Sequence, residues 1–205
     1  MTEPVDAPSA PLRTLQEAGR FIGACCWIER RLFEVLGTWV TIERDPRAKL
    51  LFAEHSRHHG WHSELWTERL PVARGLDAAE LVLAPSPQAR ALFDALAALQ
   101  APDGTVERLQ VLYGVLLPRL VEEHRAALIA ASTVTEAPTI RALTLIGRDD
   151  AADLEQGRAL LDLVTGGLGA GVELGAALDA RWADLDAGGG LLSRLDEPIS
   201  RVGEG

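Results

Sequence analysis

Cysteine, methionine and tyrosine are scarce in this chain of 205 residues, which has two cysteines, one methionine and one tyrosine. The two cysteines, Cys25 and Cys26, are neighbours in the sequence. Because consecutive side chains on a helix point about 100° apart, we expect no disulfide bond between them. A chain without disulfides is typical of a reducing compartment, so the expected location is the cytoplasm.

Basic residues are outnumbered by acidic ones, 20 to 30, which gives a net charge of −10 and a pI near 5.0. This charge argues against a nucleic-acid partner and against an anionic membrane surface. No stretch as long as a membrane span is free of charged residues. Residues 1–6 have neither the basic start nor the apolar run of a signal peptide. We therefore expect neither a membrane nor a nucleic acid as partner.

Strand patterns and internal repeats are also missing, whereas 47% of the residues are hydrophobic and alanine and leucine dominate. This composition is too apolar for a disordered protein and favours helices. Heptad spacing of apolar residues and helix-capping residues predict four long helices and a shorter one in a crossover. Their expected ranges are 14–42, 45–69, 88–99, 103–132 and 135–165.

The two ends of the chain differ in composition from its middle. Residues 1–12 are rich in proline and predict a disordered lead-in, and residues 13–165 hold the helical domain. Residues 166–205 form a glycine-rich extension with one possible helix at about 172–184, and the last 20 or so residues predict a flexible tail.

Four of the five histidines lie between residues 55 and 62, within the second expected helix. With Leu51 as the reference, His58, His62 and Leu65 fall in one narrow sector of that helix, and Glu54 lies close beside it. The i, i+4 spacing of His58 and His62 places both imidazoles on one side, as a metal ion requires. The simpler interpretation is a half-exposed face on which histidines only form hydrogen bonds.

The other three long helices also carry carboxylates at core positions of their heptads. A buried carboxylate costs several kcal/mol unless a cation, an arginine or a shared proton compensates it. The positions are Glu29 in the first helix, Glu123 in the third, and Asp150 and Asp153 in the fourth.

With these residues the chain resembles the ferritin-like di-iron carboxylate superfamily, in which two helices each supply a glutamate and two supply a Glu-x-x-His motif. The resemblance covers about residues 14–165, including a longer crossover between the second and third long helices. It implies an all-α fold: an antiparallel, ferritin-like four-helix bundle with an extra crossover helix and a flexible C-terminal tail. Glu29 and Glu123 match the single glutamates, Glu54 matches the first motif, and Asp150 takes the acidic place of the second.

The chain departs from the family's pattern at both histidine positions, where Arg57 and Asp153 stand instead. Three arrangements fit these residues. In the first, His58, with or without His62, replaces the missing histidine and Asp153 binds through oxygen, which suits iron or manganese. In the second, Arg57 pairs with Asp153 and supplies the positive charge of a metal. In the third, His58 and His62 bind a single zinc ion with one carboxylate.

The first arrangement predicts a non-haem iron or manganese oxidoreductase that acts on a small molecule. Its metal ligands are expected among Glu29, Glu54, His58, His62, Glu123, Asp150 and Asp153. The alternative is a metal-free helical protein with a ferritin-like core, which acts through its surface in protein interactions or as a homodimer. Exposed tryptophans on the first two helices, or an Arg57–Asp153 contact, would favour this alternative.

Overall fold

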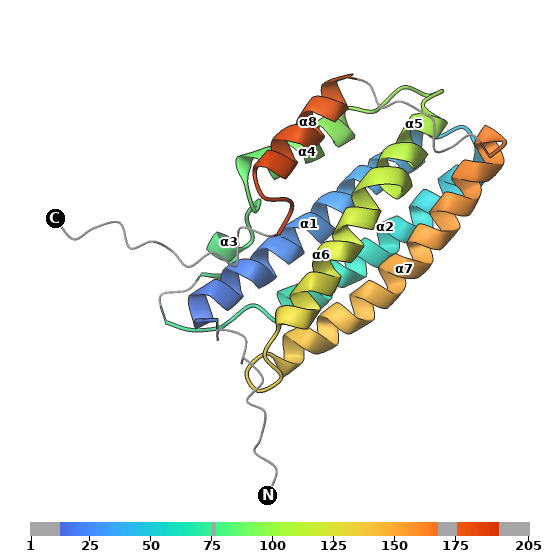
Figure 1. The fold of residues 1–205 in the computed structure, drawn as a ribbon. Helices are drawn as coiled ribbons and strands as arrows, with labels where there is room; N and C mark the ends of the chain where they lie inside the picture. Colours follow the sequence, from blue (N-terminus) through green and yellow to red (C-terminus); the bar gives the residue numbers. More distant parts are fainter. Residues whose placement is uncertain (1–12, 75–76, 168–175, 193–205) are drawn as a thin grey trace, which may run out of the picture.

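The computed structural model describes residues 13–74, 77–167 and 176–192, and this part of the chain consists of helices and loops with no strand element (Figure 1). The all-α prediction is therefore confirmed. The lead-in expected at residues 1–12 lies outside the described residues. In the described part, no helix is both long enough and apolar enough to cross a membrane.

Four long helical segments account for most of the structure. The first two are α1 (Leu15–Ile42) and α2 (Pro46–Thr67), and the last is α7 (Ala137–Thr165). The third is continuous but changes type, from α5 (Thr105–Leu109) through the π-helix η1 (Gln110–Leu116) to α6 (Leu117–Ala130). Shorter helices are α3 (Ala78–Leu81), α4 (Pro87–Ala97) and α8, described from Ala176 to Ala187. These bounds lie close to the expected ranges.

Local sequence explains where these helices begin and end. Thr14 and Glu17 form a capping box at the start of α1, in which each side chain accepts a hydrogen bond from the other's backbone N–H. Asp45 caps α2 and Pro46 is its first residue. Gly166 ends α7 in the left-handed conformation, with φ of 63°.

Contacts between the long segments give their directions. Cys26 contacts Ser63 and Ser56 donates to the Phe33 carbonyl, so α1 and α2 are antiparallel. The His62–Asp149 and His58–Asp153 contacts make α7 antiparallel to α2. The contacts of His124 with Asp150 and of Tyr113 with Arg158 make the segment from η1 to α6 antiparallel to α7. The helices α1 and α7 thus run one way and α2 and α6 the other. The four segments lie side by side in Figure 1.

The π-helix η1 lies just before Pro118. Proline has no backbone N–H, so the α-helical hydrogen bond to the Gly114 carbonyl is missing there. A π-helix has i→i+5 hydrogen bonds and more residues per turn than an α-helix, so it changes which residues face the core further along. Tyr113, which lies in η1, is fully buried.

Helices α3, α4 and α8 lie along one side of the four long segments, with α4 against α1 and α8 against α4 (Figure 1). In this layer Trp182 and Leu185 are buried, and so are Leu191 and Leu192 just beyond α8. The expectation of a flexible tail is therefore wrong for Leu191 and Leu192, because their side chains join the core. Residues 193–205 lie outside the described part of the chain.

Candidate metal centre

The buried face of α2 is rotated by about one residue from the face that the sequence analysis expected. The buried positions follow a four-and-three spacing that includes Phe52, His55, His59, His62 and Trp66. The expected reference residues, Leu51 and Leu65, are only half-buried. Leucine and phenylalanine are adjacent at 51 and 52, so apolar spacing alone did not fix the register. Packing of the larger Phe52 and Trp66 side chains does.

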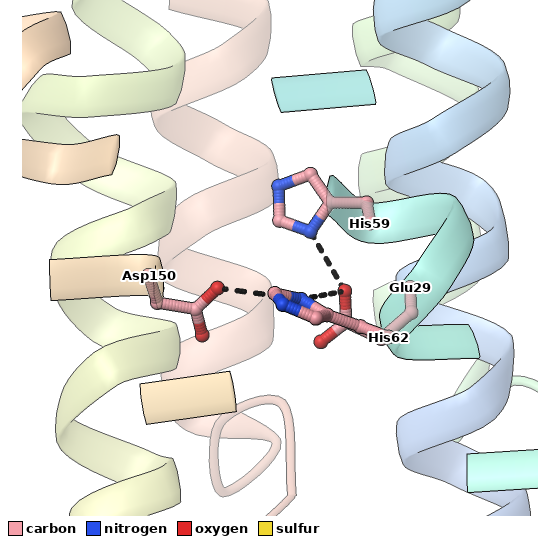
Figure 2. Close-up of side chains that lie close together, drawn as sticks. All are labelled: Glu29, His59, His62 and Asp150. Atoms are coloured by element: carbon pink, nitrogen blue, oxygen red, sulfur yellow. Dashed lines mark hydrogen bonds and ion pairs between the residues drawn. The ribbon is translucent and has the colours of Figure 1, made fainter. Parts of the chain in front are cut away.

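Four side chains from three helices converge on one point in the core: Glu29 from α1, His59 and His62 from α2, and Asp150 from α7 (Figure 2). One potential ligand atom from each lies within 4.8 Å of all the others, and no side chain is more than 1% exposed. This buried group of two imidazoles and two carboxylates can hold a metal ion.

Distances within the group show how its atoms are aimed. Nδ1 of His59 is 2.7 Å from Oε2 of Glu29, and Nδ1 of His62 is 3.4 Å from the same oxygen. Nδ1 of His62 is also 3.8 Å from Oδ1 of Asp150, so this ring lies between the two carboxylates (Figure 2). Within the part of the chain that the structure describes, Oε1 of Glu29, Nδ1 of His62 and Oδ1 of Asp150 have no hydrogen-bond partner. A buried polar atom without a partner costs free energy, which a bound ion could recover.

Without a metal, the group depends on a proton for charge balance. Burial alone would lower the pKa of His62, but the carboxylates of Glu29 and Asp150 outweigh it and raise that pKa to about 9. Burial alone would raise the pKa of Glu29, but His62 and His59 hold it well below its ordinary value. His62 therefore carries the positive charge that a metal ion would otherwise supply.

Two further side chains contact members of the group and orient them. Nε2 of His62 is 3.3 Å from a carboxylate oxygen of Asp149, so the ring's other nitrogen remains directed at Glu29 and Asp150. Nδ1 of His124, on α6, is 3.2 Å from Oδ2 of Asp150. A histidine whose second nitrogen meets a carboxylate is the usual arrangement around metal ligands.

A second layer of polar side chains lies one helical turn away. Asp153 is within 3.0 Å of Nδ1 of His58 and 3.3 Å from Nε2 of His55. Nδ1 of His55 is 2.7 Å from the hydroxyl of Tyr113. Burial, together with His59 and His58, lowers the pKa of His55 to about 3, so its ring is neutral. All five histidines of the chain thus belong to one polar seam.

Two of the predicted ligands lie elsewhere. Glu54 is exposed on α2, because the register of that helix turns it outward. Glu123 accepts hydrogen bonds from the backbone N–H groups of Leu191 and Leu192 and so fastens the chain beyond α8. After η1 the inward position of α6 is 124 and not 123, so His124 faces Asp150. Contrary to the expectation, neither Glu54 nor Glu123 lies in the four-residue group.

The other predicted residues fall into separate layers. Glu29, His62 and Asp150 join the four-residue group, whereas His58 and Asp153 pair with each other. The proposed Arg57–Asp153 ion pair does not form; Arg57 is exposed and donates to Nε2 of His58 at 3.1 Å. The predicted zinc pair is also separated, because His58 meets Asp153 and His62 meets Glu29 and Asp150.

His55, His59 and His124 also belong to this polar seam, although they were not among the expected ligands. The first two had a signal, because His55, His59 and His62 follow the four-and-three spacing of a core stripe. His124 also had a local signal, because Leu117, Leu120, His124 and Ala127 are spaced by three, four and three residues. The expected heptad kept the phase of the residues before η1, and that phase selected Glu123.

No known protein family, curated protein or solved structure matches the chain.

Proposed function

We propose that this protein is a metal-dependent oxidoreductase, with a non-haem iron or manganese ion bound by Glu29, His59, His62 and Asp150. The observation that carries the proposal is the buried group of two imidazoles and two carboxylates, three of whose polar atoms have no hydrogen-bond partner among the described residues. Mixed nitrogen and oxygen ligands of this kind suit iron and manganese. The ferritin-like bundle belongs to the same proposal, supported by four long helices and the crossover through α4.

The surrounding residues support chemistry at such an ion. When bound, the metal supplies the electron-transfer steps that amino-acid side chains cannot perform. Glu29 and Asp150 balance its charge, and their burial excludes water from the centre. Asp149, whose side chain is 34% exposed, can accept a hydrogen bond from Nε2 of His62, which leaves Nδ1 as the nitrogen that gives up its proton to bind a metal.

Elemental analysis of protein expressed without a histidine tag, in medium containing iron and manganese, tests the proposal. We expect at least about one equivalent of iron or manganese per chain. His59→Gln should weaken binding by more than about 100-fold, because it removes a ligand and not merely a supporting contact. Glu54→Gln is the matched control on the same helix and should retain the metal.

Oxygen consumption then tests the reaction class. Protein loaded with Fe²⁺ under anaerobic conditions should consume oxygen when exposed to air, and the His59→Gln variant should not. A protein that binds no stoichiometric metal, or a His59→Gln variant that keeps its metal, would contradict the proposal. Zinc as the only bound metal would exclude the oxidoreductase function.

A protein-interaction role is the second candidate, favoured by a groove between the outer faces of α1 and α2. The groove has a volume of about 650 Å³, and its lining includes Phe33 and Trp61, which are 48% and 43% exposed. Large exposed aromatic side chains are typical of interaction sites. A Trp61→Ala variant that keeps its metal but loses self-association in analytical ultracentrifugation would support this role as a homodimer.

A further inference from the structure

The histidines of α2 form two successive pairs of the same spacing. His55 and His58 are three residues apart, as are His59 and His62, and the second pair follows the first by four residues. Residues four apart lie on the same face one turn along a helix. On the antiparallel helix α7, Asp150 meets the second pair and Asp153 meets the first. The polar seam is therefore built twice, once in each layer.

We propose that His55, His58 and Asp153 form a second metal position, for a divalent ion that prefers imidazole ligands, such as Zn²⁺ or Co²⁺. The set offers Nε2 of His55, Nδ1 of His58 and the carboxylate of Asp153. Two imidazoles and one carboxylate, with the remaining positions filled by water, are a common ligand set for these ions. No side chain is shared with the first group.

The buried nitrogen of His55 is the independent observation that points to a ligand. His55 is 1% exposed, and its Nε2 lies 3.3 Å from Asp153 but makes no hydrogen bond with any residue that the structure describes. On the other side of the ring, Nδ1 is 2.7 Å from the Tyr113 hydroxyl. With its proton on Nδ1, the ring donates to the Tyr113 oxygen and leaves the Nε2 lone pair directed at Asp153. This is how a second contact orients a metal-binding histidine.

His58 makes this position more accessible than the first. Its side chain is 21% exposed, whereas Asp153 and His55 are buried. The His55 and His58 rings are nearly parallel, with centroids 5.9 Å apart, so a bound ion must draw them together. His58, at the solvent edge, is the side chain that can move. The second position should therefore exchange its ion faster and bind it more weakly than the enclosed first group.

In the metal-free protein, the Arg57 side chain is a cation that opposes metal binding at His58. Its guanidinium donates to Nε2 of His58 at 3.1 Å, which leaves the proton of that ring on Nδ1, facing Asp153. A metal at Nδ1 moves that proton to Nε2, where it opposes the guanidinium. Arg57 is exposed and can turn away. Its removal should tighten binding at the second position by about two- to tenfold, the strength of one such hydrogen bond.

Titration of the metal-free, untagged protein with Co²⁺, followed by calorimetry and visible absorption, tests the proposal. We expect about two equivalents, of unequal affinity. His58→Ala should lose the weaker equivalent and keep the tighter one, Arg57→Ala should tighten the weaker one, and Glu54→Gln should change neither. Because His58 and Arg57 are partly exposed, these variants should fold, which circular dichroism verifies.

Tyr113 provides a second readout, because it is the only tyrosine of the chain. Tyrosine labelled with ¹³C at Cζ should give one NMR signal, which shifts when Zn²⁺ binds at His55 and does not shift in His58→Ala. One equivalent that survives His58→Ala and is lost in His59→Gln would overturn the second position while leaving the proposed function intact. Two equivalents retained in His58→Ala would also overturn it, and no binding at all would overturn both.

Discussion

Tyr113 lies against a position where only glycine fits. A Cβ atom on Gly157 of α7 would be 2.1 Å from the Tyr113 ring, far inside van der Waals contact. The ring also stacks on Phe52, with centroids 6.5 Å apart, and its hydroxyl meets His55. The smallest possible side chain on α7 therefore fixes the phenol that orients a histidine on α2.

Gly157→Ala should lower the free energy of unfolding by about 1–3 kcal/mol, because the added methyl group forces Tyr113 out of place. Gly147→Ala is the control on the same helix, where an added Cβ meets nothing within 4 Å. That change should raise stability by about 0.5–1 kcal/mol, since alanine restricts the unfolded chain and favours helix. Urea unfolding curves measure both, and equal effects of the two substitutions would contradict this account of Tyr113.

Among the helices, α2 and α6 decide the composition of the candidate site. Sequence periodicity located both but misjudged which residues face inward. In α2 the error was a choice between the adjacent residues Leu51 and Phe52. In α6 the π-helix before it changes the phase, so His124 and not Glu123 meets Asp150. A heptad pattern that is continued from the residues before η1 assumes a regular helix, and so it misses that change.

Glu123 has a structural role that a substitution can separate from metal binding. Its carboxylate accepts hydrogen bonds from two backbone N–H groups just beyond α8. Hydrogen bonds to charged groups contribute about 1.5–3 kcal/mol, so Glu123→Ala should reduce hydrogen-exchange protection of the Leu191 and Leu192 amides by about 10- to 100-fold.

The neighbouring residue supplies the control for this test. Glu122 is exposed and pairs with Arg125 within α6, so Glu122→Ala should leave the two leucine amides unchanged. Metal content should stay the same in both variants. Loss of metal in Glu123→Ala, with protection unchanged, would restore Glu123 as a ligand.

For the molecule as a whole, the polar seam predicts how the stability of the metal-free protein depends on pH. The pKa of His62 is raised to about 9, so its contribution is complete below its unfolded pKa, about 6.5, and is lost as pH rises to 9. The pKa of His55 is lowered to about 3 in the folded protein. As pH falls below about 6.5, this histidine is protonated in the unfolded chain but not in the folded one, which lowers the free energy of unfolding. The pKa of Glu29 is lowered in the folded protein, so its carboxylate stabilises the fold at pH values above the pKa that it has in the unfolded chain.

The melting temperature in the presence of a chelator should therefore be highest near pH 6.5 and fall on both sides. In His62→Gln the melting temperature should no longer fall between pH 6.5 and 9, but it should still fall as the pH drops below 6.5. Added metal should do the same in the wild type, because a bound ion replaces the proton on His62. Thermal denaturation followed by circular dichroism measures this, and a melting temperature in the metal-free wild type that stays constant from pH 6.5 to 9 would refute it.

The sequence by itself determined the helices and part of the site. Capping residues such as Thr14 and Asp45 act through their immediate neighbours, so they located the helix ends without knowledge of the fold. The same local periodicity placed Glu29 and Asp150 in the core, because their helices have one unambiguous apolar stripe. Four histidines in eight residues likewise indicated that α2 carries the polar side chains.

Only the tertiary structure decided which of these polar groups meet. Phe52 and Trp66, packed against neighbouring helices, set the rotation of α2 and directed His59 inward and Glu54 outward. Contact with α7 divided the histidines into two layers, one at Asp150 and one at Asp153. Burial of Leu191 and Leu192 likewise depends on Glu123, 68 and 69 residues away in the chain. Such choices depend on shape complementarity between distant segments, which no local pattern encodes.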